Sequence, residues 1–221
     1  MDPLKINYPA GTKPPKDQDS LYQGQSIKKS HRTLNYGNRG MTLEEDINTT
    51  NKQYLARDIA VIHKKPTPIQ VVSVDYPKRS AAKITEAYYR QASTTDYNGV
   101  YKGHYLDFEA KETKNKTNFP LSNFHSHQIK HMAHCLKHGG IVFVIIRFTT
   151  REETFVCPAE IIIAWWKKMD QHKKRKSIPY EVLSEASYLV HIGYSPRLDY
   201  LKAIDQMIQT DFKEVEINER K

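Results

Sequence analysis

A predicted β-hairpin in the middle of the chain constrains the fold more than any other stretch. Residues Tyr97–Tyr101 and His104–Glu112 are rich in aromatic and β-favouring side chains, and Lys102-Gly103 between them supplies a tight turn. Two strands joined by so short a connection must pair antiparallel. The hairpin therefore fixes which residues of the two segments lie side by side.

The second strand of this hairpin carries its charged side chains on one face. Side chains alternate across a strand, so one face receives Tyr105, Asp107, Glu109 and Lys111, and the other receives Leu106, Phe108 and Ala110. A carboxylate beside an ammonium suits metal-assisted hydrolysis, because the carboxylate holds a divalent cation and the ammonium aligns or activates a water. The alternative is an exposed polar face with an ion pair that contributes little.

Asp96 adds a second carboxylate at the entrance to the hairpin. Antiparallel pairing brings the segment before Tyr97 alongside Glu109 and Lys111. An acid on one strand with Glu-x-Lys on the other is the PD-(D/E)xK arrangement, which is typical of metal-dependent nucleases. Two carboxylates oriented in this way suit Mg²⁺, a hard cation that prefers oxygen ligands.

The rest of the chain predicts a mixed α/β (α+β) fold. Helices are expected over residues 42–56 and 122–138, from Pro158 onward, and from Pro196 onward with Pro196 in the first turn. Strands are expected at 59–62, 69–74, 84–89, 141–148 and 154–157. Thr42 followed by Glu45 has the spacing of a capping box for the first helix. This order of elements predicts a mixed sheet flanked by helices.

Composition restricts the class of protein and of partner. Lys and Arg total 34 against 25 Asp and Glu, a net charge of +9, which favours a polyanionic partner. A mean hydropathy of −0.70 and the lack of a long apolar run predict no membrane span. The beginning of the chain lacks a secretory pattern, and two cysteines exclude a disulfide framework, so we expect a cytoplasmic protein.

The chain divides into three predicted parts. Residues 1–35 contain four prolines and no apolar periodicity, which predicts a flexible basic arm, either bound to a phosphate backbone or merely solvated. Residues 36–210 form one folded domain. Residues 211–221 form a charged tail that is expected to fray.

A histidine stripe raises the question of a zinc site. His127, His131, His134 and His138 recur at helical spacing within residues 122–138. No HExxH motif is present, and Cys135 and Cys157 lack the paired spacing of a zinc site. A polar helix face is the simpler interpretation. No glycine-rich phosphate loop is present either, so ATP hydrolysis is not expected.

Six sequence blocks together resemble the RecU family, the Holliday junction resolvases of Gram-positive bacteria. The blocks are Asn35–Met41, Asp58–Pro68, Tyr76–Ser80, Ser93–Tyr101, Asp107–Thr113 and Pro196–Ile204. The resemblance covers roughly residues 35–208, and it is specific because the blocks recur in order. It implies a restriction-endonuclease-like core with a protruding stalk at about residues 66–89. It also implies a homodimer with one active site in each subunit.

The resemblance also implies a set of site residues. Asp96 and Glu109 would be metal ligands, with the Ala110 carbonyl as a further ligand, and Mg²⁺ would be the cofactor with Mn²⁺ as a substitute. Lys111 would be the catalytic lysine. Glu44 on the first helix and Gln128 on the 122–138 helix would support the site, with Gln128 also a metal-binding residue.

The expected substrate is four-way junction DNA. Arg39, Lys64, Lys78 and Arg79 lie in tracts poor in core residues, which suits phosphate contacts. Tyr88 at the end of the stalk could stack on exposed bases. The resemblance further implies strand annealing, modulation of the RecA recombinase, contact with the RuvAB branch-migration complex, and association with the nucleoid.

The sequence thus predicts a Mg²⁺-dependent endodeoxyribonuclease that leaves 5′-phosphates and acts in recombination and repair. Two other interpretations stay open at this point. One is a non-catalytic, architectural junction-binding protein whose carboxylates are structural. The other is a nuclease of the restriction type that acts on ordinary duplex DNA.

Overall fold

The structure is a computed structural model that describes residues 42–77, 81–90, 94–172 and 176–219. The predicted arm over residues 1–35 lies outside the described residues. No helix in the described part of the chain is both long enough and apolar enough to cross a membrane.

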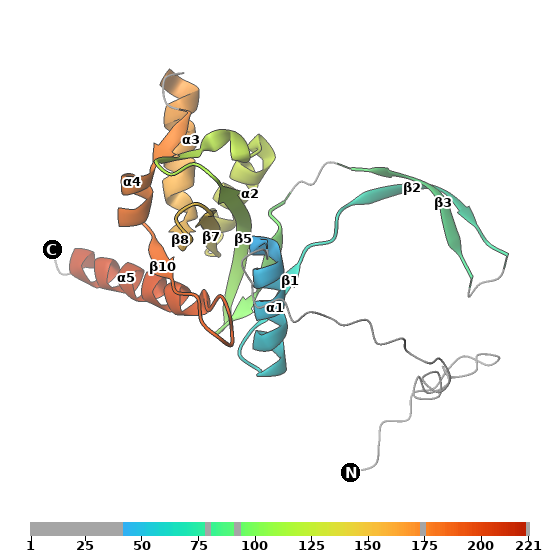
Figure 1. The fold of residues 1–221 in the computed structure, drawn as a ribbon, viewed down its shortest axis with the longest axis horizontal. Coiled ribbons are helices and arrows are strands. Elements are labelled where there is room, and N and C mark those ends of the chain that lie inside the picture. Colours follow the sequence, from blue (N-terminus) through green and yellow to red (C-terminus); the bar gives the residue numbers. More distant parts are fainter. Residues whose placement is uncertain (1–41, 78–80, 91–93, 173–175, 220–221) are drawn as a thin grey trace, which may run out of the picture. The chain divides into compact units, whose positions relative to one another are not determined.

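Six strands form the central sheet in the spatial order β1-β4-β5-β7-β8-β10 (Figure 1). Their bounds are β1 Val61–Lys64, β4 Tyr97–Tyr101, β5 His104–Thr113, β7 Ile141–Phe148, β8 Glu153–Pro158 and β10 Tyr188–Val190. β5 and β7 pair in parallel, and every other neighbouring pair is antiparallel. The mixed sheet and the hairpin of β4 and β5 are therefore confirmed.

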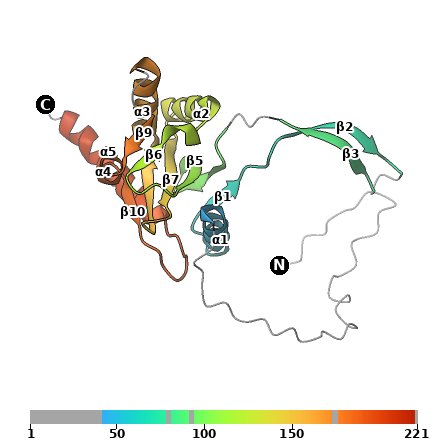
Figure 2. The same cartoon turned by 45° about the horizontal axis from the view of Figure 1, so that its top comes forward.

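Helices cover both faces of this sheet (Figure 2). On one face, α1 (Leu43–Ala56) and α5 (Leu201–Glu219) pack in one apolar cluster with alternate residues of β5. On the other face, α2 (Ser126–Lys137) and α3 (Ala159–His172) pack in a second cluster with alternate residues of β7. The predicted sheet flanked by helices is confirmed, and β5 lies between the two layers.

A capping box and an ion pair hold the first turn of α1 in place. The Thr42 hydroxyl accepts from the Glu45 N–H at 3.3 Å, and the Glu45 carboxylate accepts from the Thr42 N–H at 2.9 Å, which confirms the capping box. Arg147 of β7 places a guanidinium nitrogen 2.6 Å from the buried carboxylate of Asp46. These contacts hold the turn that carries Glu44 against the sheet.

A separate two-stranded antiparallel sheet is formed by β2 (Ile69–Asp75) and β3 (Lys83–Tyr89). No side chain of either strand is buried. Both strands were predicted, and their hairpin occupies the part of the chain where the stalk is expected. Because the hairpin buries nothing, it adds no core to the domain.

Five short elements escape prediction, one of which is β10 of the central sheet. β6 (Asn118–Pro120) pairs with β9 (Ser177–Pro179), while η3 (Leu121–Asn123) and α4 (Tyr180–Glu185) follow them directly in the chain. Segments of three to six residues contain too few positions to show a period.

Four predicted boundaries are wrong. The strand expected at residues 59–62 is β1 at Val61–Lys64, because the chain turns at Asp58, which has a positive φ. The 122–138 helix begins only at Ser126, because Phe124 has an extended backbone after the 3₁₀ turn. The last helix begins at Leu201 and not at Pro196, since Gly193 N–H donates to the Arg197 carbonyl and a turn occupies this stretch. That helix also continues to residue 219, where a frayed tail was expected, because no proline or glycine interrupts it.

Candidate active site

β5 buries two carboxylates in the middle of the sheet. It pairs with β4 along residues 104–108 on one side and with β7 along residues 106–113 on the other. Leu106, Phe108 and Ala110 enter the cluster beneath α1 and α5. Asp107 and Glu109 are fully buried, at 0 % exposure, on the face that α2 covers. The alternative of an exposed polar face is therefore wrong.

Asp96 lies beside Glu109. Tyr97 of β4 pairs with Phe108 of β5 in an antiparallel register. The residue before Tyr97 therefore lies opposite the residue after Phe108, which places Asp96 opposite Glu109. The Asp96 backbone carbonyl accepts from the Lys65 N–H at 2.7 Å, which continues the pairing of β1 with β4. The two carboxyl groups are within hydrogen-bonding reach. The structure thus brings together the two acids that the sequence predicts as a pair.

The two oxygens of Glu109 have different surroundings. Oε1 accepts from Gln128 Nε2 at 2.6 Å and lies 2.8 Å from Lys111 Nζ. Oε2 is buried and has no hydrogen-bond donor among the described residues. A buried carboxylate oxygen without a donor is costly, and a bound cation would remove that cost.

Burial and the neighbouring groups shift the pKa of Glu109 in opposite directions. Burial, followed by the contact with Asp96, raises the pKa of Glu109 to about 8, although the Lys111 ammonium opposes the shift. Two adjacent carboxylates repel each other, so ionising both costs free energy unless a cation lies between them. The pair therefore favours either a shared proton or a divalent metal.

Gln128 is positioned by the start of α2. Its side-chain oxygen accepts from the His125 backbone N–H at 2.9 Å, so the amide faces Glu109 with its NH₂ group. Because Gln128 is buried and both ends of its amide are engaged, its rotamer is fixed. It acts on Glu109 directly, as a partner of Oε1.

Glu44 lies at the edge of this group and is exposed. Its carboxylate is 2.5 Å from the Lys64 ammonium at the end of β1. Burial raises the pKa of the Tyr97 hydroxyl, and the negative charges of Glu44, Asp96 and Glu109 raise it further. These charges all act on the Tyr97 hydroxyl, and a supporting role of Glu44 in the site stays a prediction.

Comparison with known proteins decides the family. The model of the family described as RecU, recombination protein U, matches residues 38–206. A Holliday junction resolvase RecU from Geobacillus kaustophilus is 53 % identical over 208 residues, covering 94 % of this chain and all of the relative. The chain belongs to the RecU family. The resemblance found in the sequence is thereby confirmed.

Other RecU proteins are similarly close. The Lactobacillus acidophilus Holliday junction resolvase RecU is 54 % identical and covers 92 % of this chain and 97 % of its own length. The Geobacillus sp. (strain WCH70) protein of the same name is 57 % identical over 91 % of this chain and 97 % of its own length. Among solved structures, the Hjc Holliday junction resolvase of Archaeoglobus fulgidus matches with a TM-score of 0.32 and 13 % identity, over 48 % of this chain and 78 % of its own.

The residues predicted to contact DNA are only partly described. Lys64 lies at the end of β1 and is paired with Glu44. Tyr88 of β3 is 59 % exposed, and its hydroxyl donates to Glu86 at 2.7 Å. Arg39, Lys78 and Arg79 lie outside the described residues. For this RecU family member, a role of these five residues stays a prediction, as does that of the Ala110 carbonyl.

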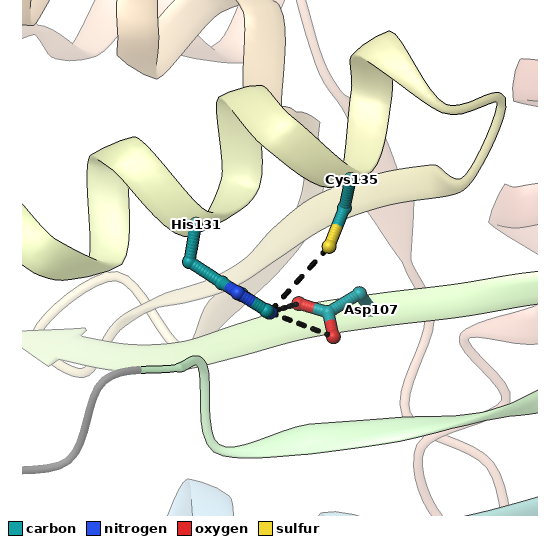
Figure 3. A group of neighbouring side chains, drawn as sticks. All are labelled: Asp107, His131 and Cys135. Atoms are coloured by element: carbon teal, nitrogen blue, oxygen red, sulfur yellow. Dashed lines mark hydrogen bonds and ion pairs between the residues drawn. The ribbon is translucent and has the colours of Figure 1, made fainter.

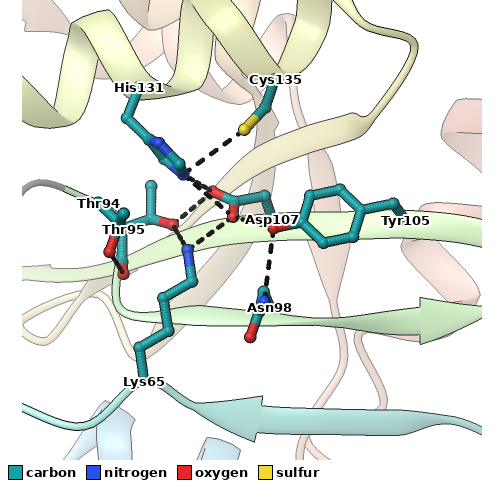
Figure 4. A network of polar contacts seen from close by, with 8 residues as sticks. All are labelled: Lys65, Thr94, Thr95, Asn98, Tyr105, Asp107, His131 and Cys135. Atoms are coloured by element: carbon teal, nitrogen blue, oxygen red, sulfur yellow. Dashed lines mark hydrogen bonds and ion pairs between the residues drawn. The ribbon is translucent and has the colours of Figure 1, made fainter.

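Sequence reasoning missed a polar network beside the acidic pair (Figure 4). Lys65 Nζ donates to Asp107 Oδ2 at 2.7 Å and to the Thr95 hydroxyl at 2.9 Å, and Thr95 in turn donates to Asp107 Oδ1. The Tyr105 hydroxyl donates to the same carboxylate at 2.9 Å. Burial would raise the pKa of Asp107, but the bonds from Lys65 and Thr95 outweigh it and lower that pKa.

This network joins the segments that carry the acids. Lys65 follows β1, Thr95 precedes Asp96, and Asp107 lies two residues before Glu109 on β5. The available signal was the alternation that puts Asp107 on the same face as Glu109. Its partners could not be recognised, because Lys65 and Thr95 are far apart in sequence and carry no motif.

Proposed function

We propose that this chain is a Mg²⁺-dependent endodeoxyribonuclease that resolves Holliday junctions. One observation carries the proposal: a buried Glu109 with one donor-less oxygen faces Asp96, while Lys111 lies 2.8 Å from its other oxygen. Membership of the RecU family supports the same conclusion, since several relatives are named Holliday junction resolvases.

Asp96 and Glu109 fit a divalent cation. Both supply carboxylate oxygens, which hard cations prefer, and the donor-less Oε2 of Glu109 needs a positive partner. A bound Mg²⁺, or Mn²⁺ in its place, would stabilise charge on the phosphoryl oxygens and favour hydroxide near neutral pH. The Ala110 carbonyl would complete the ligand set. Gln128 would support the set by donating to Glu109 Oε1, because its own oxygen accepts from the His125 N–H.

Lys111 would hold and activate the attacking water. Its ammonium is half-buried between Glu109 and the ring of Phe124, whose centroid is 5.9 Å away. This placement restrains the amine near the carboxylate, and an ammonium has three donors, so hydrogens beyond the one directed at Glu109 can serve a water or a phosphate oxygen. In-line attack on the phosphodiester would leave a 5′-phosphate and a 3′-hydroxyl.

Junction DNA would be held through its phosphates and its shape. The net charge of +9 favours a polyanion, and Arg39, Lys64, Lys78 and Arg79 would contact phosphates. The exposed β2–β3 hairpin would be the stalk, with Tyr88 placed to stack on bases at the crossover. Two subunits in a symmetric dimer would cut the two opposed strands.

The wider role follows from the family. We expect the protein to act in recombination and repair in the cytoplasm, at the nucleoid. We also expect it to anneal strands, to modulate the RecA recombinase and to contact the RuvAB complex.

The test is cleavage of a mobile four-way junction by single variants. Asp96→Ala, Glu109→Ala and Lys111→Ala should each lose at least about 100-fold in cleavage rate, because even indirect partners of a metal cost about 10–100-fold. Junction binding, measured by gel shift, should persist in all three. Glu185→Ala, an exposed carboxylate on α4, is the control and should cut normally.

Two other interpretations are separated by the same assay. An architectural protein would bind the junction without metal-dependent cleavage by the intact chain. A nuclease of the restriction type would cut linear duplex DNA as fast as the junction. Full cleavage by either acid variant would contradict the proposed site.

A further inference from the structure

A second cluster of metal-binding side chains lies beside the acidic pair but differs from it chemically (Figure 3). Asp107 projects from β5, and His131 and Cys135 project toward it from α2. His131 Nε2 lies 3.3 Å from both carboxylate oxygens of Asp107 and 3.5 Å from Cys135 Sγ. One ligand atom from each residue falls within 4.8 Å of the other two.

The two separations measured from His131 match edges of a zinc tetrahedron. With Zn–N and Zn–O bonds of about 2.0–2.1 Å and a Zn–S bond of about 2.3 Å, tetrahedral angles put N and O about 3.3 Å apart and N and S about 3.5 Å apart. The observed separations from His131 are 3.3 Å to Asp107 and 3.5 Å to Cys135. A water would take the fourth position, since the His131 side chain keeps 22 % of its surface exposed.

The helix and the strand hold the three ligands independently of any ion. His131 and Cys135 are four residues apart on α2, so they lie on the same face one turn apart. The Asp107 carboxylate is oriented by Lys65, Thr95 and Tyr105. A carboxylate has about four lone-pair positions, so it can bind an ion while it keeps these donors. Hydrogen-bonded supports of this kind are typical of metal ligands.

We propose that Asp107, His131 and Cys135 form a second metal site, which takes Zn²⁺ and not Mg²⁺. Sulfur and imidazole ligands select zinc-like ions, whereas the Asp96 and Glu109 pair offers carboxylate oxygens. The bound ion would join α2 to β5. It would therefore fix the helix that carries Gln128 against the strand that carries Glu109. The proposal does not depend on the nuclease activity.

Cobalt is the probe for the test, because tetrahedral Co²⁺ bound to a thiolate absorbs intensely and zinc does not. The metal-free full-length chain is titrated with Co²⁺ in excess Mg²⁺, which occupies the carboxylate pair. We expect one equivalent of Co²⁺ to produce a sulfur-to-cobalt charge-transfer band and visible bands of tetrahedral cobalt. Added Zn²⁺ should then abolish both.

Variants assign the band to its ligands. Cys135→Ser should abolish it, and Cys157→Ala should leave it intact, because Cys157 is the only other cysteine and is buried in the core. His131→Ala should weaken cobalt binding at least about tenfold, since even indirect partners cost that much. Asp96→Ala should leave the band unchanged, which separates this site from the acidic pair.

Thermal unfolding supplies a second readout. Zn²⁺ should raise the melting temperature of the intact chain and not that of Cys135→Ser. Cys135→Ser should match the intact chain in melting temperature without metal and in junction cleavage with Mg²⁺, because Cys135 is partly exposed. Absence of the cobalt band in the intact chain, or its survival in Cys135→Ser, would overturn the proposal.

Discussion

At the scale of single residues, the burial of the Glu109 carboxylate determines its chemical properties. Water is excluded from the carboxylate, one oxygen is taken by Gln128 and Lys111, and the other has no donor among the described residues. Its raised pKa follows from this burial and from Asp96. The same features that make the acid unstable as an anion make it a good ligand for a cation.

This acid predicts a pH dependence of stability. The pKa of Glu109 is about 8 in the folded chain, above the ordinary unfolded value, so protonation favours the folded state. Its contribution is complete at acidic pH and is lost as pH rises toward 8. In chelator, the melting temperature should fall from about pH 4.5, where the unfolded chain loses this proton, to about pH 8, and Glu109→Gln should flatten that fall.

Calorimetry across this pH range measures the effect. Glu185→Gln, which removes an exposed carboxylate, is the control and should keep the slope of the intact chain. Mg²⁺ should also reduce the slope, because it favours the ionised pair. Equal slopes for the intact chain and Glu109→Gln would show that Glu109 titrates normally.

At the level of residues, the sequence predicts what lies along one strand. Alternation over His104–Glu112 and the hairpin turn are sufficient to bring Asp96, Glu109 and Lys111 together, as the structure confirms. The contact of His131 with Asp107 could not be predicted in this way. It depends on how α2 packs on the sheet, and a helical period shows which face is polar but not which strand that face meets.

At the scale of elements, the buried ion pair between Asp46 and Arg147 holds α1 to β7. Asp46→Ala should lower the free energy of unfolding by about 3–5 kcal/mol, because it removes the buried carboxylate that pairs with the Arg147 guanidinium. Urea denaturation measures the change. The control is Lys202→Ala, which breaks an exposed pair with Asp199 and should cost less than about 1 kcal/mol.

The β2–β3 hairpin gives a contrasting prediction. Its strands bury no side chain, so replacement of residues 68–90 by a short glycine-serine linker should barely change the melting temperature. This variant should bind a four-way junction at least about tenfold more weakly, because it lacks the DNA contacts proposed for the stalk. Tyr88→Ala in the intact hairpin tests the stacking residue alone. Unchanged junction binding by the linker variant would contradict the stalk assignment.

Predictability at this scale depends on local signals. The Thr42 and Glu45 capping box located the start of α1 correctly, because both partners lie within one turn. Pro196 was misleading, since proline favours a first helical turn but also favours loops, and contacts around Gly193 decide between them. Tertiary contacts of this kind have no signature within the segment itself.

At the scale of the whole molecule, a symmetric dimer would need both subunits to cut a junction completely. Mixing the intact chain with Lys111→Ala should therefore yield mixed dimers that nick only one of the two strands. Denaturing gels resolve the nicked product from the resolved one. Full resolution by isolated mixed dimers would show that one subunit can cut both strands.

The position of β5 has a consequence for how activity is lost. Residues 106–108 of β5 have paired strands on both sides and helices over both faces, so their amides should be among the last of the described residues to exchange with deuterated water. Local breathing elsewhere then leaves the strand that carries Glu109 and Lys111 in place, because β7 pairs with both residues. On heating, the enzyme should stay fully competent until the cooperative transition begins, with no inactive but compact species preceding it.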